Sequence, residues 1–577
     1  MSAQALPWIL LRAALAAAVL TVGMPSAGQD QAVAPARART VLDLQAVRRS
    51  ESVTLSAAAG QRGSFALTHL NPAANAWFLL TLQAPGSRAA VDYHLENAAP
   101  SRQRVGLDPA RPGQLTIVSD DATAHCVLWP GGTLEMARHS MLPYAPLCEG
   151  KLFLRNAVYG NRSTLEATTE FLRDHVWRGE RIIGFVRREF YRDAFVERAK
   201  PASAPLSDAG RAVPPGAPPA ARMQSAGAQR ALMAEGLGID LSAQGGLVPG
   251  QWYGATGLDG VYVSVAQPGA LSAGAVQRRP LDGVEAVALT YLVAFDLAAF
   301  DLAFALGTEH PRLGWSSHMR DELRDPRLPG PDGIDNAAPL ARTGMVSPAL
   351  QAGTVATFTG GFKREHGAFL HGNLAAVNRG SHYGFIEQGV VFSPLMPGLA
   401  TLFVLNDGST EMKTWSHDDD RLLGQIRHAR QNGVPLIERD PVGGPSMFGA
   451  LVDQWGAGNW SGSADEQLRT LRAGACLVEH ANRRFLVYGY FSAATPRAMA
   501  HVFQAYGCHY AMHLDMNALE HTYLALYPHS GSRIGVEHLV KGMEVLDKNV
   551  GATLVPRFLG FADDRDFFYL VRREDKR

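Results

Sequence analysis

Alternating apolar and polar positions dominate the first third of the chain. Four segments, 52–55, 77–82, 91–95 and 114–118, alternate or form short apolar runs, and Gly, Pro, Asn or Asp residues separate them. A period of two is that of a strand with one buried face. We therefore expect a small β-sandwich-like domain over residues 40–200. Such domains bind glycans or serve as packing units and spacers, and the pattern favours the packing role.

A change of composition at residues 201–230 predicts a linker, because Pro and Ala are abundant there and no apolar period is present. Beyond it, residues 245–577 alternate strands, such as 286–296 and 354–359, with long loops. A helix is expected at 420–431, after three acids at 418–420. Carboxylates at a helix N-terminus are favoured by its dipole without any metal. The predicted fold class is α+β, with a mixed α/β catalytic-type domain after the β-rich one.

The clearest local pattern lies between residues 495 and 517. Thr495 suits an N-cap, Pro496 suits the first helical position and Gly507 suits the end of a helix. The residues after Gly507 alternate as in a strand, with His513 and Asp515 on one face. The pattern predicts a helix that leads into a strand and places the Asp515 carboxylate at the rim of a sheet.

The first residues resemble a secretory signal. Arg12 precedes an apolar run over residues 13–23, and small residues up to Ala27 suit cleavage after that position. The run is short for a membrane span, although an uncleaved anchor is an alternative. We expect a signal peptide over residues 1–27, a periplasmic or secreted protein, and no stable membrane span after cleavage.

The four cysteines form two local pairs, Cys126 with Cys148 and Cys476 with Cys508. An oxidising compartment would close both as disulfides, whereas a cytosolic protein would keep four buried thiols. The signal-like start favours disulfides. The 54 basic and 54 acidic residues balance, so charge does not indicate a nucleic-acid partner. Nothing in the sequence calls for a cofactor.

Several separated segments resemble, in their order, the phosphodiester glycosidase family, in a divergent bacterial-type form. The segments are Pro249-Gly250-Gln251-Trp252, Gly260-Val261-Tyr262-Val263, 286–296, 307–311, Thr359-Gly360-Gly361-Phe362, 472–478, 485–487 and 495–515. The resemblance covers roughly residues 247–527. It implies an exported hydrolase that acts on a sugar-phosphodiester or glycosidic bond, with a polysaccharide or glycoconjugate as substrate.

The resemblance also implies catalytic residues. Asp515 matches the Asp of the family's closing Leu-Asp-Gly-Gly motif, and a carboxylate there suits acid/base work. Its alternative role is to cap the turn that follows. His513 shares its face and is a second catalytic candidate, with structural hydrogen bonding as the alternative.

Further residues are substrate-binding candidates. A glycine turn lets backbone amides approach an anion, and basic residues follow it at once. A guanidinium suits phosphate recognition, although a surface ion pair is its ordinary alternative. The candidates are Thr359, Gly360, Gly361, Arg364, Arg472 and Asn517, with Glu387, His371 and Asn373 as weaker ones.

Two departures from the family indicate divergence of substrate or chemistry. Thr359 replaces the family's Asn, and residues 516–521 replace its closing glycines. His509, His513, Glu520 and His521 crowd this segment, but their spacing matches no helical metal signature, so no metal site is expected. The main alternative to a hydrolase is a non-catalytic periplasmic protein that binds polysaccharide or assembles the envelope. A third hypothesis is an enzyme with a wholly different substrate.

Overall fold

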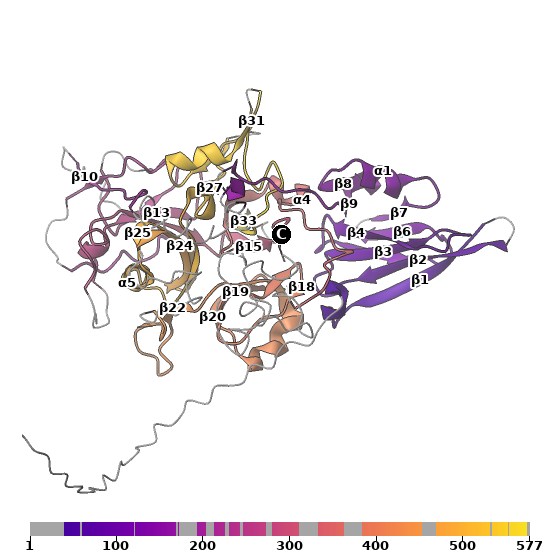
Figure 1. Cartoon of the computed structure of the whole chain (residues 1–577), viewed down its shortest axis with the longest axis horizontal. Helices are drawn as coiled ribbons and strands as arrows, with labels where there is room; N and C mark the ends of the chain where they lie inside the picture. Colours follow the sequence, from indigo (N-terminus) through magenta and orange to yellow (C-terminus); the bar gives the residue numbers. More distant parts are fainter. Residues whose placement is uncertain are drawn as a thin grey trace, which may run out of the picture.

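The computed structural model describes residues 40–573 except 58–59, 121, 165, 169–170, 172–192, 203–212, 225–229, 243–245, 273–279, 311–332, 363–382, 453–468, 531–532 and 552. The predicted signal peptide therefore lies outside the described residues. Figure 1 shows two neighbouring parts of the chain, with the strands before residue 156 gathered at one end of the molecule.

The N-terminal part consists of two antiparallel sheets that share a core. The six-stranded sheet has the order β1 (Arg49–Ser56), β2 (Arg62–His69), β3 (Trp77–Gln83), β4 (Val91–Asn97), β9 (Leu152–Arg155) and β8 (Tyr144–Leu147). The second sheet comprises β5 (Gln103–Leu107), β6 (Gln114–Ser119) and β7 (Ala122–Val127). Phe65, Phe78 and Ile117 are fully buried in the core, to which both sheets contribute. The short helix α1 (Thr133–His139) precedes β8.

Three sheets of eight, five and five strands form most of the rest of the described chain, which also contains three two-stranded sheets. One has the order β12 (Trp252–Gly254), β13 (Val261–Ala266), β14 (Thr290–Asp296), β25 (Arg483–Ala494), β24 (Thr470–His480), β26 (Tyr510–Met516), β22 (Pro435–Glu438) and β23 (Met447–Phe448). The second has the order β15 (Phe300–Ala305), β33 (Phe567–Arg572), β16 (Thr354–Thr359), β27 (Leu524–Leu526) and β30 (Glu537–His538). The third has the order β18 (Val390–Ser393), β17 (Phe385–Glu387), β21 (Ile426–Gln431), β19 (Ala400–Leu405) and β20 (Thr410–Thr414). All three contribute to one core cluster, for example through Tyr291, Phe358 and Leu402.

The predicted α+β class is wrong, because the described chain is β-rich throughout. The helices whose bounds lie within the described residues are short: α1, α4 (Pro348–Gln351), α5 (Pro496–Ala505) and a few 3-10 turns. Strands such as β14 and β26 are buried along their whole length. Both were expected as strands, and the class is wrong because segments expected as helix form short turns and strands instead.

The expected helix at 420–431 illustrates the error. A 3-10 helix covers His417–Gln425 and ends where β21 begins. Asp419 accepts the Ser416 backbone amide at 2.8 Å and closes a capping box, so the acidic residues begin only a short turn. The next six residues pair with β17 and β19. Strand pairing thus overrides local helix preference there.

The helix and strand at 495–517 are confirmed. The Thr495 hydroxyl accepts the Ala498 amide at 3.3 Å, Pro496 is the first residue of α5, and Gly507 has a left-handed φ of 78°. Strand β26 then runs one residue beyond Asp515 and lies between β24 and β22.

Both predicted disulfides are present. The Cα–Cα distance is 5.4 Å for Cys126–Cys148 and 5.8 Å for Cys476–Cys508, and both pairings fit an oxidising compartment. Within the described residues, no helix is long and apolar enough to cross a membrane.

Part of the Pro/Ala-rich segment packs against the C-terminal sheets. The Pro219 carbonyl accepts the Trp252 indole N–H at 2.9 Å, and the Arg222 amide donates to the Ala505 carbonyl at 2.9 Å. These contacts fix the described residues of this segment against β12 and α5. The domain boundaries at 200 and 245 stay a prediction.

Candidate functional site

The glycine turn directly follows the end of β16. The Thr359 hydroxyl donates to the His521 carbonyl at 2.7 Å, and the Gly360 amide donates to the Asp566 carbonyl at 2.8 Å. Gly361 has a φ of 145°, and a Cβ there would lie 2.8 Å from the Asn432 side-chain oxygen. Glycine is therefore required by both conformation and space. Arg364 lies outside the described residues.

Asn432 connects this turn to β26. Its Oδ1 accepts the Phe362 amide at 3.2 Å, and its Nδ2 donates to the carbonyls of His513 and Leu514 at 2.5 and 2.6 Å. The Phe362 ring meets the His513 ring edge-on, with 4.8 Å between centroids. The turn and the strand, separate in the sequence, are thus joined by one buried amide.

Arg472 lies on the other side of His513. Its Nη1 is 3.4 Å from His513 Nε2, and its Nε donates to the Ala494 carbonyl at 2.7 Å. Both side chains are fully buried, so Arg472 is not a surface residue. Burial and then the Arg472 charge lower the pKa of His513 well below its usual value, which keeps the imidazole neutral. Burial lowers the pKa of Arg472 to about 9.

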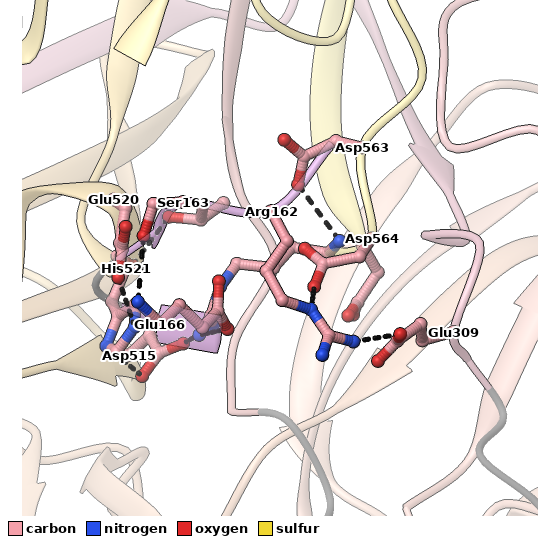
Figure 2. A network of polar contacts seen from close by, with 12 residues as sticks. Arg162, Ser163, Glu166, Glu309, Asp515, Glu520, His521, Asp563 and Asp564 are labelled. Carbon is pink, nitrogen blue, oxygen red and sulfur yellow. Dashed lines mark hydrogen bonds and ion pairs between the residues drawn. The ribbon is translucent and has the colours of Figure 1, made fainter. Parts of the chain in front are cut away.

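Asp515 is buried rather than exposed at a sheet rim, with 3% of its surface accessible. Its Oδ2 accepts Arg565 Nη1 at 2.7 Å, and its Oδ1 accepts the Met516 amide at 2.8 Å. Arg565 Nη2 donates to Glu166 Oε1 at 2.6 Å, so one guanidinium bridges two carboxylates. Figure 2 shows Glu166 and Asp515 close together.

The charges around Arg565 keep it ionised. Burial alone would lower the pKa of Arg565, but the charges of Glu166, Asp515 and further acids raise it well above its usual value. An arginine paired in this way binds carboxylates strongly in a low-dielectric environment. Arg565 is thus a fixed positive charge at the centre of the site.

Glu520 and His521 lie at the same place (Figure 2). His521 Nδ1 is 3.9 Å from Asp515 Oδ1, and its Nε2 is 3.4 Å from Glu520. Burial alone would raise the pKa of Glu520, but the hydrogen bond and charge of His521, with the Arg565 charge, lower it to about 2. Glu520 is therefore an ionised member of the cluster at neutral pH.

A run of four charged residues, Asp563-Asp564-Arg565-Asp566, supports the site from the segment before β33. All four are about 1% exposed. Their partners are Arg557 for Asp563 at 2.8 and 3.0 Å, Arg162 for Asp564 at 3.0 Å, and Arg430 and His310 for Asp566 at 2.7 and 2.5 Å. Arg430 also donates to the Phe362 carbonyl at 2.8 Å, so the run holds the glycine turn as well. Although burial alone would raise the pKa of Asp566, the charges of Arg430 and His310 hold it well below its usual value.

The network reaches solvent at one end. Arg162 and Glu309 form an ion pair there, with 27% and 31% of their side chains exposed (Figure 2). Asp564 connects this pair to the buried part. Among the described residues, no group of three or more His, Cys, Asp or Glu side chains is arranged to hold a metal ion.

The substrate-binding candidate Asn517 and the weaker candidate Glu387 lie apart from this arrangement. Asn517 follows the end of β26 with a left-handed φ of 80°, and its side-chain oxygen accepts the Thr470 hydroxyl at 3.1 Å. Glu387 lies 3.7 Å from Arg155 of the N-terminal part. His371 and Asn373 lie outside the described residues.

Several members of the network are absent from the sequence-based candidates, namely Arg162, Glu166, His310, Arg430, Asn432, Arg557 and 563–566. The charged run offered one signal, since it stands between the apolar residues 558–562 and the strand 567–571. Glu166 and Arg430 offered none, because each is an ordinary charged residue in a polar stretch.

Comparisons with known proteins give little beyond this geometry. No protein-family model matches the chain, and no curated protein matches it. One similar solved structure is the catalytic domain of zebrafish N-acetylglucosamine-1-phosphodiester alpha-N-acetylglucosaminidase, auto-inhibited by its pro-peptide. The two chains are 10% identical with a TM-score of 0.27, over 55% of this chain and 85% of that one.

A second similar structure is an exported protein of Burkholderia pseudomallei. It is 13% identical with a TM-score of 0.14, over 94% of this chain and 98% of that one. At these TM-scores both likenesses are weak, and neither supports a statement about function.

Proposed function

We propose that this protein is an exported glycan-active hydrolase that cleaves a sugar-phosphodiester or glycosidic bond in envelope or extracellular polysaccharide. The observation that carries the proposal is convergence. The resemblance singles out four features one by one, and in the structure all four belong to one buried polar network. They are the glycine turn, Arg472, His513 and Asp515. Arg472 stands on β24 next to His513 and Asp515 on β26, and the glycine turn reaches them from the end of β16 in a different sheet.

In this proposal the buried network pre-organises the reacting groups. Asp515 is the acid/base or orienting carboxylate, held by Arg565, and His513 is a neutral imidazole beside it on β26. Arg472 and the Thr359–Gly361 turn supply a cation and amides for the anionic or hydroxyl-rich part of the substrate. Fixed donors in a low-dielectric site stabilise developing negative charge without reorganisation.

A test is turnover of aryl glycosides and sugar phosphodiesters by the purified protein and its Asp515→Asn variant. General acid/base roles contribute about 100-fold to 10,000-fold to rate, so a loss of that size is expected. The matched control is Glu96→Gln, which also neutralises a carboxylate on a buried arginine, here Arg155 at 2.5 Å in the N-terminal part. Unchanged turnover in Asp515→Asn would remove this residue from the mechanism.

One observation favours the second candidate function, a non-catalytic polysaccharide-binding protein. Asp515 is 3% exposed, and both of its oxygens already accept hydrogen bonds. A carboxylate used only to stabilise the fold would look the same. Glycan binding without turnover of any tested substrate would support this alternative.

A further inference from the structure

A cavity of about 430 Å³ opens where the N-terminal sheets meet the rest of the chain. We call it the seam cavity. One wall comes from β4, β9 and α1 of the N-terminal part (Figure 1), and the other from residues 336–342. Ligand sites occur preferentially where two such parts of a chain meet.

Arginines outnumber acids in this cavity. Arg138, Arg155 and Arg342 line it together with the single acid Asp92. Arg155 forms ion pairs with Glu96 and Glu387, at 2.5 and 3.7 Å.

Arg138 differs from Arg155, because within the described part of the chain it forms no ion pair. Its Nη2 donates to the Asp92 carbonyl at 2.7 Å, and its guanidinium lies 4.4 Å from the centroid of the Tyr93 ring. Arg138 therefore keeps N–H donors and its charge for a ligand.

His94 adds a buried donor to the wall. Its Nδ1 accepts the Ala341 amide at 3.0 Å, so in the neutral ring the proton is on Nε2. Nε2 is buried and has no hydrogen-bond partner among the described residues, and the ring meets the Trp77 ring edge-on at 4.8 Å. A buried donor without an acceptor is costly, so such a group calls for an explanation.

We propose that the seam cavity is a binding subsite for an oxyanion, a carboxylate or a phosphate, carried by a saccharide. Arg138 supplies the charge and His94 Nε2 a neutral donor, while Asp92 limits the net positive charge and can accept a sugar hydroxyl. The choice of a saccharide as carrier rests on the proposed function. The preference for an oxyanion does not, because it follows from the residues of the cavity.

The subsite adjoins the candidate site. Arg342 in the cavity wall donates to the His310 carbonyl at 3.2 Å, and His310 Nδ1 is 2.5 Å from Asp566. Asp566 in turn holds Arg430 and, through it, the glycine turn. Within the proposed function, the seam cavity would hold a unit of the glycan distant from the bond that reacts.

Calorimetric titration of the full chain with glucuronate, glucose 6-phosphate and glucose at one fixed ionic strength tests the proposal. We expect saturable binding of one or both anions and none of glucose, and the tighter anion identifies carboxylate or phosphate as the natural group. Arg138→Gln should weaken binding at least about tenfold, since it removes a charge-assisted contact. Asp92→Asn should tighten binding severalfold, because it removes a like charge.

The matched control is Arg104→Gln. Arg104 is an exposed arginine of the same part whose Nη1 also donates to backbone carbonyls, at 3.0 and 3.1 Å, away from the cavity. Its loss should change affinity less than twofold. Equal weakening by Arg104→Gln and Arg138→Gln, or binding of glucose as tight as that of the anions, would overturn the subsite.

Asp515→Asn separates this proposal from the proposed function. The variant should bind the anions as the parent protein does, because Asp515 does not line the cavity. Anion binding that depends on Arg138, in a protein that turns over no substrate, would refute the hydrolase and leave the subsite standing. Turnover without any anion binding would do the reverse.

Discussion

The candidate site and the region around the seam cavity, which we call the seam, each bury one arginine between two carboxylates. Arg565 lies between Asp515 and Glu166 at 2.7 and 2.6 Å, and Arg155 lies between Glu96 and Glu387 at 2.5 and 3.7 Å. The candidate site reaches solvent through the Arg162–Glu309 pair, whereas the seam borders a cavity with His94 in its wall. Among the described residues, the buried donors His94 Nε2 in the seam and Arg565 Nε in the candidate site both lack an acceptor, but only His94 lines a cavity of this size. Both arrangements tie distant parts of the chain together.

The difference shows that buried charge by itself does not identify a ligand site. Buried ion pairs often add little net stability over apolar packing, yet they are costly to break. In the seam, the informative features are the cavity and the spare donor. In the candidate site, the informative feature is the meeting of segments that the sequence singles out.

The largest expected effect is the loss of either central arginine. Arg565→Gln leaves the buried Asp515 and Glu166 carboxylates without their cation, and Arg155→Gln leaves the buried Glu96 carboxylate without its cation, so each should lower the free energy of unfolding by about 3–5 kcal/mol. Urea denaturation at pH 7 measures this. A cost below about 1 kcal/mol at either position would show that its carboxylates are solvated and the parallel is false.

The second expected effect is that the contributions of Glu520 and Glu387 to stability depend on pH in opposite directions. The folded pKa of Glu520 is about 2 against 4.5 unfolded, so its stabilisation is present above pH 4.5 and lost as pH falls to about 2. Burial raises the pKa of Glu387 to about 7, an effect that Arg155 only partly offsets, so its contribution is present below pH 4.5 and lost as pH rises through 7. Each shift corresponds to a free energy on the order of 3 kcal/mol.

Unfolding of the parent protein, Glu520→Gln and Glu387→Gln across this pH range checks the signs. The difference between parent and Glu520→Gln should shrink on acidification from pH 4.5. The difference between parent and Glu387→Gln should change between pH 4.5 and 7 instead. If the two differences changed with pH in the same way, the opposite pKa shifts assigned to Glu520 and Glu387 would be wrong.

A third pair of substitutions adds one methyl group in each region. A Cβ at Gly361 would lie 2.8 Å from the Asn432 amide, and one at Gly389 would lie 2.5 Å from the Asn71 amide. Both glycines have left-handed φ values, 145° and 75°. Each alanine variant should lose roughly 1–3 kcal/mol of stability.

Turnover distinguishes the two glycine variants. Gly361→Ala should lower turnover as well as stability, because it moves the turn that contacts β26. Gly389→Ala should lower the melting temperature only. Equal loss of turnover in both variants would mean that activity follows overall stability and not the glycine turn.

The smallest expected effect comes from two buried threonine hydroxyls. Thr359 donates to the His521 carbonyl at 2.7 Å in the candidate site, and Thr343 donates to the Tyr144 hydroxyl at 2.8 Å in the seam. Substitution by valine should cost about 1 kcal/mol at each position. Only Thr359→Val should also change the KM for a small substrate, and an effect of Thr343→Val on that KM would contradict the separation of the two regions.

Much of the fold is predictable where local signals agree. The caps at Thr495 and Gly507 and the alternation after them define α5 and β26, and the spacing of cysteines predicts both disulfides. The class is wrong because segments such as 426–431 form strands through pairing with distant neighbours. A hexapeptide that contains two arginines and a glutamine gives no periodic signal of burial.

The candidate site is predictable only in its apolar framework and its motif residues. Asp515, Arg472 and the glycine turn stand out by position, and the structure brings them together. Their partners do not stand out, since a charged run such as 563–566 ordinarily indicates a solvated loop. Its burial depends on arginines contributed by residues 162, 430 and 557, which no local pattern connects.

The contact between Glu166 and Arg565 joins residues 399 positions apart. The central ion pair therefore needs residues from both halves of the described chain. A fragment that ends before residue 563 cannot complete the network, however well its own sheets form.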